Sequence, residues 1–169
     1  MSTSTPQLML PAAVVSHADM ARLLRELESI DNELETQKAR HQGESGKYHL
    51  PTMSQALSDF LLSNKLDITN DHVRMDLKSQ VRKLKDHAPV MHMTFSTEVD
   101  PESLQDIAAW VRHELHPQAL ISVGLQPSLV AGVYIRTPNH VYDMSVRAFM
   151  QDSRKLIVEA LDSLKEPAK

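Results

Sequence analysis

The apolar residues of this chain follow a helical period up to Ala88-Pro89 and a strand period directly after it. Before the proline they recur every three or four positions, as on the buried face of an α-helix. After it, Met91, Met93 and Phe95 alternate with polar residues, as in a half-buried strand. This change of period predicts an α+β protein, with an N-terminal helical bundle followed by a small C-terminal mixed α/β module.

The first half divides into a tail and three predicted helices. Residues 1–15 contain two prolines and a Ser/Thr cluster, which predicts a flexible tail, and residues 16–88 form the predicted helical domain. Ser16 is a plausible N-cap of the first helix, with Asp19 supporting its first turn. A second helix is predicted from Thr52, and a third from near Asn70.

The first predicted helix carries an apolar stripe with alternating spacings of three and four residues. Its members after Met20 are Leu23, Leu27, Ile30 and Leu34. Such a stripe packs into the bundle of its own chain or docks against a helix of a partner. Both readings stay open at this point, and the four residues are candidates for a partner-facing surface.

The second half, residues 89–169, mixes strands with helices. A strand is predicted over 91–96, and Asp100-Pro101 predicts the start of a helix that runs to Leu115. Two strands follow over 120–123 and 130–136, then a turn over 137–140 and a short return strand over 141–142. A last helix is predicted from about Asp143, with an apolar side made of Val146, Phe149, Met150, Ile157, Leu161 and Leu164.

The composition argues against several classes of function. The net charge of −4 is the opposite of the basic excess of a nucleic-acid binder. The chain has no cysteine, which excludes disulfides, thiolate metal sites and a cysteine nucleophile. No apolar run approaches the roughly 20 residues that span a bilayer. We expect a soluble, cytoplasmic protein that binds no cofactor and no nucleic acid, and whose membrane association is indirect, through a partner.

Two short motifs come close to known sites without matching them. His113 and His116 lie three apart on one predicted helix, whereas the zinc-protease helix places its histidines four apart, and no obvious third ligand accompanies them. The stretch from Gly43 to Lys47 lacks the spacing of a phosphate loop and follows a helix instead of a strand. We therefore predict no metal, no nucleotide and no catalytic residue.

The segment from Gln126 to Arg147 is the most specific part of the chain. Gly132, beside Ala131, predicts a close approach of a neighbouring backbone to a strand, or a bulge. Asp143 is most simply the N-cap of the last helix, and a Ser145 hydroxyl would add to that cap. Arg147 could pair with Asp143 one turn back.

The same segment resembles the C-terminal signature of the delta subunit of F-type ATP synthases, called OSCP in mitochondria. Ser128, Leu129 and Gly132 look like the family's small-residue box, and Arg136 looks like the end of the strand that follows. Asp143, Ser145 and Arg147 are similar to the opening of the family's last helix. The resemblance covers about residues 90–165, with the match concentrated in 126–147.

The resemblance implies a non-catalytic subunit of the peripheral stalk, which serves ATP synthesis coupled to proton transport. Its implied partners are the N-terminal segments of the alpha subunits and the C-terminal helices of the b-type stalk subunits. Its implied location is cytoplasmic, peripheral to the inner membrane as part of the complex. The alternative is a small cytosolic adaptor or regulator with a delta-like module.

Overall fold

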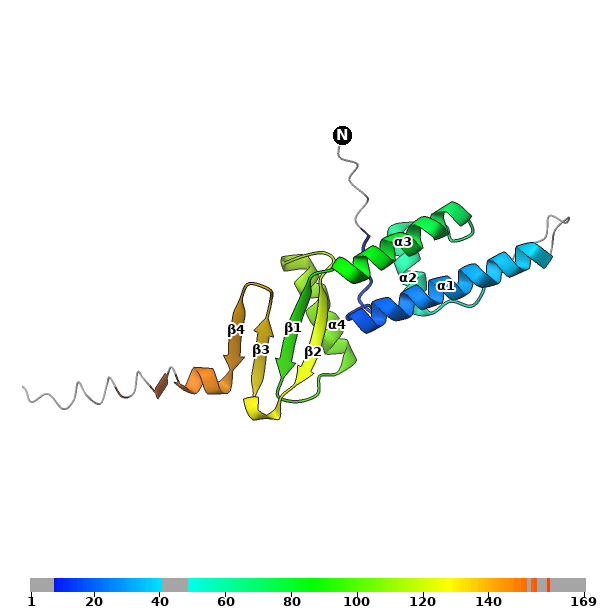
Figure 1. Ribbon diagram of the computed structural model, residues 1–169. Helices are drawn as coiled ribbons and strands as arrows, with labels where there is room; N and C mark the ends of the chain where they lie inside the picture. Colours follow the sequence, from blue (N-terminus) through cyan, green and yellow to red (C-terminus); the bar gives the residue numbers. More distant parts are fainter. Residues whose placement is uncertain (1–7, 41–48, 152, 155–157, 159–169) are drawn as a thin grey trace, which may run out of the picture. The chain divides into compact units, whose positions relative to one another are not determined.

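The computed structural model of the chain describes residues 8–40, 49–151, 153, 154 and 158. It has the predicted α+β class, with helices mainly in the first half and a four-stranded sheet in the second (Figure 1). The elements are α1 (His17–Arg40), α2 (Gln55–Asn64), α3 (Asp71–His87), β1 (Val90–Phe95), α4 (Pro101–Glu114), β2 (Leu120–Leu125), the 3-10 helix η1 (Pro127–Leu129), β3 (Gly132–Arg136) and β4 (Val141–Ser145).

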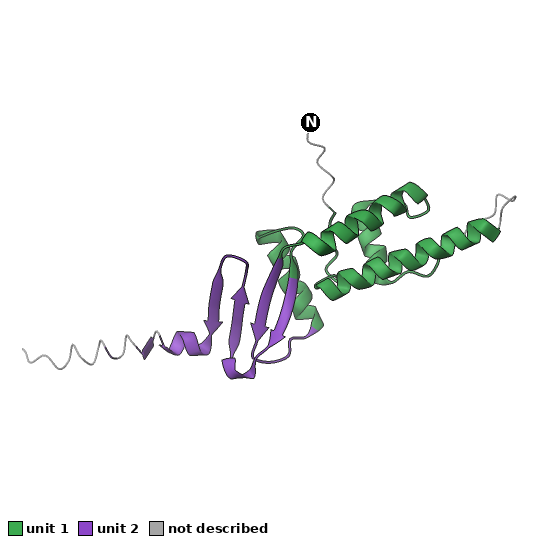
Figure 2. Cartoon of the chain, in the orientation of Figure 1, with its two compact units in different colours: residues 1–89, 101–120 green, residues 90–100, 121–169 purple. Residues whose placement is uncertain are grey.

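The chain forms two compact units (Figure 2). The helical unit comprises residues 1–89 and 101–120, and the sheet unit comprises residues 90–100 and 121–169. The division at Pro89 lies next to the predicted boundary between residues 88 and 89. It differs from the prediction in one respect, because α4 groups with the helices that precede the sheet.

Local capping signals explain where the helices begin. At the start of α1, the Asp19 carboxylate accepts the Ser16 N–H at 2.9 Å, and the Ser16 hydroxyl accepts the Asp19 N–H at 3.3 Å. Asn70 caps α3 by accepting the N–H of His72. Both predicted starts are confirmed.

The predicted start of the second helix at Thr52 is wrong by two residues, because Ser54 is the N-cap of α2. The Ser54 hydroxyl accepts the Leu57 N–H and donates to the Glu26 carboxylate of α1 at 2.7 Å. Glu26 also accepts the N–H of Ser54 at 2.5 Å. A tertiary contact with α1 therefore selects this cap.

The apolar stripe of α1 packs into the core of the helical unit. Leu23, Leu27, Ile30 and Leu34 are all buried within one cluster that also contains residues of α2 and α3. They are not available to a partner, so the structure supports packing within the bundle.

The predicted flexible tail differs from the structure at residues 8–15. Leu8, Val14 and Val15 are buried, and Arg112 of α4 donates to the carbonyl oxygens of Pro11 at 3.0 Å and of Val14. Apolar burial and these bonds dock the segment on its own unit. Residues 1–7 lie outside the described residues.

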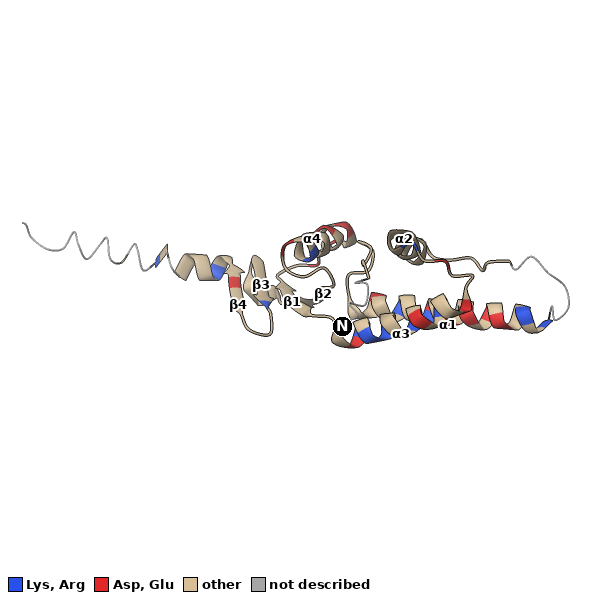
Figure 3. Ribbon diagram, turned by 90° about the horizontal axis from the view of Figure 1, so that it is seen from above, with Lys and Arg blue, Asp and Glu red and all other residues tan. Residues whose placement is uncertain are grey.

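Arg74 of α3 is the largest fully buried side chain of the helical unit, at 2% exposure. It donates to Asp31 at 2.7 Å, Asp71 at 2.7 Å and Glu35 at 3.3 Å, and to the carbonyl oxygens of Ile68 and Thr69. These bonds join α1 to α3 and occupy the guanidinium donors. Lys78 and Lys38 complete the network by pairing with Asp31 and Asp71. Figure 3 shows charged residues of both signs along α1 and α3.

The sheet has the strand order β2-β1-β3-β4. β3 is antiparallel to both β1 and β4, whereas β1 and β2 run in the same direction (Figure 1). The sheet is therefore mixed, with both parallel and antiparallel neighbours. The predicted turn is also present, since Thr137 and His140 close the hairpin between β3 and β4.

None of the helices in the described residues combines the length and the hydropathy that crossing a bilayer requires.

Candidate docking surface

Gly132 is the first residue of β3 and lies against the backbone of β4. Its φ is +97°, a conformation that residues with a side chain rarely adopt. A Cβ at this position would lie 2.3 Å from the carbonyl oxygen of Met144 and 2.8 Å from the Cα of Ser145. The predicted close approach of a neighbouring backbone is confirmed, and only glycine fits it.

The residues before Gly132 form a tight reversal that aims the chain into β3. Ser128 and Leu129 lie in η1, and the Ser128 hydroxyl accepts the side-chain amide of Gln126 at 3.0 Å. The Ala131 N–H donates to the Leu129 carbonyl at 2.7 Å around Val130, whose φ is +66°. This is a γ-turn with positive φ, a strained conformation for a β-branched residue.

The structure corrects the predicted start of the last helix. Asp143 and Ser145 lie in β4, and residues 146–151 form the first helical turns after it. Ser145 is the cap, because its hydroxyl accepts the Ala148 N–H at 3.2 Å. Asp143 instead accepts the N–H of Ser145 at 2.9 Å. Pairing of β4 with β3 as far as Ser145 opposite Gly132 delays the helix by two residues.

The same contacts determine the electrostatics at the point where β4 ends and the following helix begins. The side chain of Ser145 and then its N–H hold the pKa of Asp143 below its usual value, and the charge of Arg147 acts in the same direction. Arg136, at the end of β3, and Arg147 are both exposed. The candidate residues of this segment therefore lie together around the β3–β4 hairpin, and they act first as devices that close the fold.

One face of the sheet is apolar. Phe95 of β1 pairs with Val133 of β3, which in turn pairs with Met144 of β4. In the same way Met93 pairs with Ile135, which pairs with Tyr142. Side chains of directly paired residues lie on the same face. A Cβ on Gly124 would point at the Thr94 side chain, so Leu125 lies on the opposite face, beside Phe95. We call the following set the apolar face: Met91, Met93, Phe95, Ile121, Val123, Leu125, Val133, Ile135, Tyr142 and Met144.

Part of the apolar face is bare. Met91, Met93 and Ile121 are buried, but Val123 is 47% exposed, Leu125 54%, Tyr142 48% and Met144 60%. Ten of the sixteen exposed large apolar side chains in the described chain lie between Val123 and Val158. Concentrations of this kind mark interaction surfaces.

The first helical turns after β4 add to this surface. Val146, Phe149 and Met150, which belong to the predicted apolar side of the last helix, are all exposed. Of the same predicted apolar side, Ile157, Leu161 and Leu164 lie outside the described residues.

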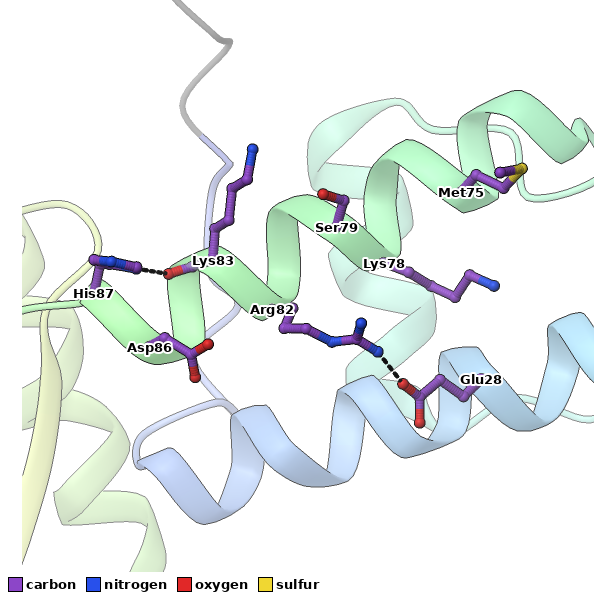
Figure 4. A pocket seen from close by; sticks show the side chains of 8 residues that line it. All are labelled: Glu28, Met75, Lys78, Ser79, Arg82, Lys83, Asp86 and His87. Atoms are coloured by element: carbon purple, nitrogen blue, oxygen red, sulfur yellow. Dashed lines mark hydrogen bonds and ion pairs between the residues drawn. The ribbon is translucent and has the colours of Figure 1, made fainter.

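The helical unit offers a second surface feature, an open hollow of about 410 Å³ on α3 (Figure 4). It is lined by Glu28, Met75, Lys78, Ser79, Arg82, Lys83, Asp86 and His87. Arg82 pairs with Glu28 at 2.7 Å, and Lys78 pairs with Asp31. Because these charges are paired with neighbours, the hollow is a solvated helix face more than a site for chemistry.

The histidine pair of the sequence does not converge on a common point. The His113 ring contacts Glu114 at 2.8 Å, whereas the His116 ring accepts the N–H of Gln118 at 3.1 Å. No group of three or more potential metal ligands occurs in the part of the chain that the structure describes.

Sequence reasoning missed the exposed part of the apolar face. The signal was present in the alternation of Tyr142, Asp143 and Met144, which is a strand pattern that continues past the predicted end of the return strand. No protein-family model matches the chain, and no curated protein does so either.

Proposed function

We propose that the chain is a delta-type, OSCP-like subunit of the peripheral stalk of an F-type ATP synthase, without catalytic activity of its own. The observation that carries the proposal is the gathering of exposed apolar side chains on the sheet unit, next to the segment that resembles the delta family. A large bare apolar surface fits a protein that works by holding partners.

The proposed action is mechanical. The subunit ties the catalytic head to the stalk, so that the head does not turn with the rotor. Contacts that bury apolar area over several elements suit this task, since they spread the load over many side chains. The buried Arg74 network supports the same role, because it stiffens the packing of α1 against α3.

Each unit has a proposed partner. The sheet unit holds the C-terminal helices of the b-type stalk subunits. The helical unit contacts the N-terminal segments of the alpha subunits, and its candidate contact is the α3 hollow with exposed Met75. The protein then lies on the cytoplasmic side of the membrane and associates with it only indirectly, through the complex.

The test is recovery of the complex from native membranes. The full chain carries an affinity tag in its own organism, membranes are solubilised in mild detergent, and subunits in the eluate are quantified by mass spectrometry. We expect alpha and b-type subunits in fixed ratio to the tagged chain, retained at raised salt because apolar contacts are not screened. If neither the alpha nor the b-type subunit is recovered, the proposal is overturned. A soluble protein recovered in their place supports the alternative, a small cytosolic adaptor.

A further inference from the structure

Asp143 lies at the centre of β4, although aspartate is one of the residues that strands disfavour. Capping does not explain its presence, since the hydroxyl of Ser145 caps the helix that follows. The Asp143 carboxylate instead accepts the N–H of Ser145, two residues further along the same strand, at 2.9 Å. The exposed charge in the middle of this strand therefore has another cause.

β4 lies at an edge of the sheet. Among the strands that the structure describes, it has a neighbour, β3, on one side only (Figure 1). All of its residues before Ser145 are exposed, and Val141, Tyr142 and Met144 among them are apolar. An exposed apolar edge presents unpaired N–H and C=O groups to which a further strand can add.

The bonds between β3 and β4 show which residues present these groups. The Val146 N–H donates to the Ala131 carbonyl at 3.0 Å, so these two residues form a bonded pair in the register of the hairpin. Bonded and non-bonded pairs alternate along antiparallel strands. Val141, Asp143 and Ser145 each lie an odd number of positions before Val146. Their N–H and C=O groups therefore point away from β3, to the outer edge.

A second copy of the chain fits this edge by its symmetry. Two antiparallel copies of β4 related by a two-fold axis present the same outward groups to each other. The register that overlaps the two strands completely places Asp143 opposite Asp143 of the second copy. In that register Tyr142 of each copy lies opposite Met144 of the other, which extends the apolar face across both copies.

Asp143 opposes this pairing in two ways. Its carboxylate meets the same carboxylate of the second copy directly across the two strands, where like charges are destabilising. A register shifted by two residues forms fewer pairs and still leaves the two Asp143 side chains at diagonal positions, about 7–8 Å apart. The carboxylate also occupies the Ser145 N–H, which in the complete overlap would donate to Val141 of the second copy.

We infer that β4 is a self-complementary edge able to join two copies of the chain into one continuous sheet, and that Asp143 keeps the free chain monomeric by blocking it. The inference accounts for the single charged residue of this strand. It goes beyond the proposed function and does not depend on it, because it concerns the purified chain alone.

The test compares full-length variants at position 143. Asp143→Val removes both the charge and the acceptor, and it supplies a residue that strands favour. Asp143→Lys removes the acceptor but keeps a charge that repels its own copy. Arg136→Val is the matched control, because it places the same new residue on the same face of β3, an interior strand. The mass in solution is measured by light scattering after gel filtration, at micromolar to millimolar concentrations.

We expect the mass of Asp143→Val to rise twofold with concentration, whereas the unmodified chain, Asp143→Lys and Arg136→Val stay monomeric. Adding Val141→Pro to Asp143→Val should restore the monomer, since proline removes an outward N–H that does not bond to β3.

Four results overturn the inference: a dimeric unmodified chain, a monomeric Asp143→Val, a dimeric Asp143→Lys or Arg136→Val, and association of Asp143→Val that persists with Val141→Pro. If far-UV circular dichroism shows that Asp143→Val does not fold, Asp143→Thr takes its place, as a smaller strand-favouring residue without charge. Each of these results leaves the recovery of the complex from membranes, and with it the proposed function, untouched.

Discussion

Gly132 shows how one residue without a side chain permits the β3–β4 hairpin. We expect Gly132→Ala to destabilise the protein by about 2–4 kcal/mol, because the added Cβ meets backbone atoms of β4 and the positive φ is retained. Urea unfolding followed by far-UV circular dichroism measures the loss. Gly124→Ala is the matched control, since the atoms nearest to its Cβ belong to the Thr94 side chain, the first at 3.2 Å, and it should cost less than about 1 kcal/mol. Equal losses would contradict this account.

Val130 presents the opposite case, a residue with a side chain where glycine fits better. Its positive φ costs about 1–3 kcal/mol for a β-branched residue. Glycine releases this strain and gives back about 0.5–1 kcal/mol through the entropy of the unfolded chain. We expect Val130→Gly to raise the free energy of unfolding by about 1 kcal/mol, measured by urea unfolding. Val123→Gly, in the interior of β2, should lower it by a similar amount. A loss at Val130 would show that its turn is not strained.

Among the elements, α1 and α3 are held together by an ionic network around the buried Arg74. Arg74→Met leaves Asp31, Asp71 and Glu35 without their shared cation, which should cost about 3–5 kcal/mol. Arg74→Lys should not restore it, since an ammonium lacks the forked donors. Trp110, the single tryptophan, lies in the same unit and reports its unfolding by fluorescence.

The matched control for Arg74 is Arg82→Met on the same helix. Arg82 is exposed, and its ion-pair partner Glu28 is partly exposed, so its loss should cost less than about 1 kcal/mol. A coupling free energy near zero between Arg74→Met and Asp31→Asn in a double-mutant cycle would contradict the proposed network.

The boundary of a helix or strand could be predicted from the sequence where the contacts that determine it lie within a few residues of that boundary. The starts of α1, α3 and α4 depend on side chains within a few residues, Ser16 with Asp19, Asn70, and Asp100-Pro101, and all three were predicted. The start of α2 depends on Glu26 of another helix, and the extent of β4 depends on pairing with β3. Sequence patterns do not contain such contacts.

The candidate surface divides in the same way. Gly132 was predictable because its neighbours are small residues before a strand. The exposed part of the apolar face was not predictable, since its exposure depends on which parts of the sheet other elements cover. Arg74 occupies the first position of an apolar stripe with Leu77, Val81 and Leu84. A charged residue in line with buried apolar residues was the sequence signal that could have predicted the burial of Arg74.

For the whole molecule, acid should weaken both units in the same range of pH. Burial, the largest influence, raises the pKa of Asp31, but bonds from Arg74 and Lys78 outweigh it and leave the pKa lowered. Bonding to Ser145 lowers the pKa of Asp143 in the sheet unit. A lowered folded pKa means that the unfolded chain binds more protons near its ordinary value of about 3.9. The stabilisation is therefore complete above that pH and is lost as pH falls through the folded pKa values.

We expect the melting temperature to be nearly constant from pH 7 to about pH 5 as far as these carboxylates determine it, and to fall steeply below about pH 4. Trp110 fluorescence follows the helical unit, and far-UV circular dichroism follows the whole chain. Asp31→Asn should lower stability at pH 7 and flatten the acid dependence seen by fluorescence, since its carboxylate no longer titrates. Asp143→Asn, in the other unit, should leave the fluorescence profile unchanged. A melting temperature that rises between pH 5 and pH 3, or an Asp31→Asn profile as steep as that of the unmodified chain, would show that Asp31 is not held ionised by Arg74.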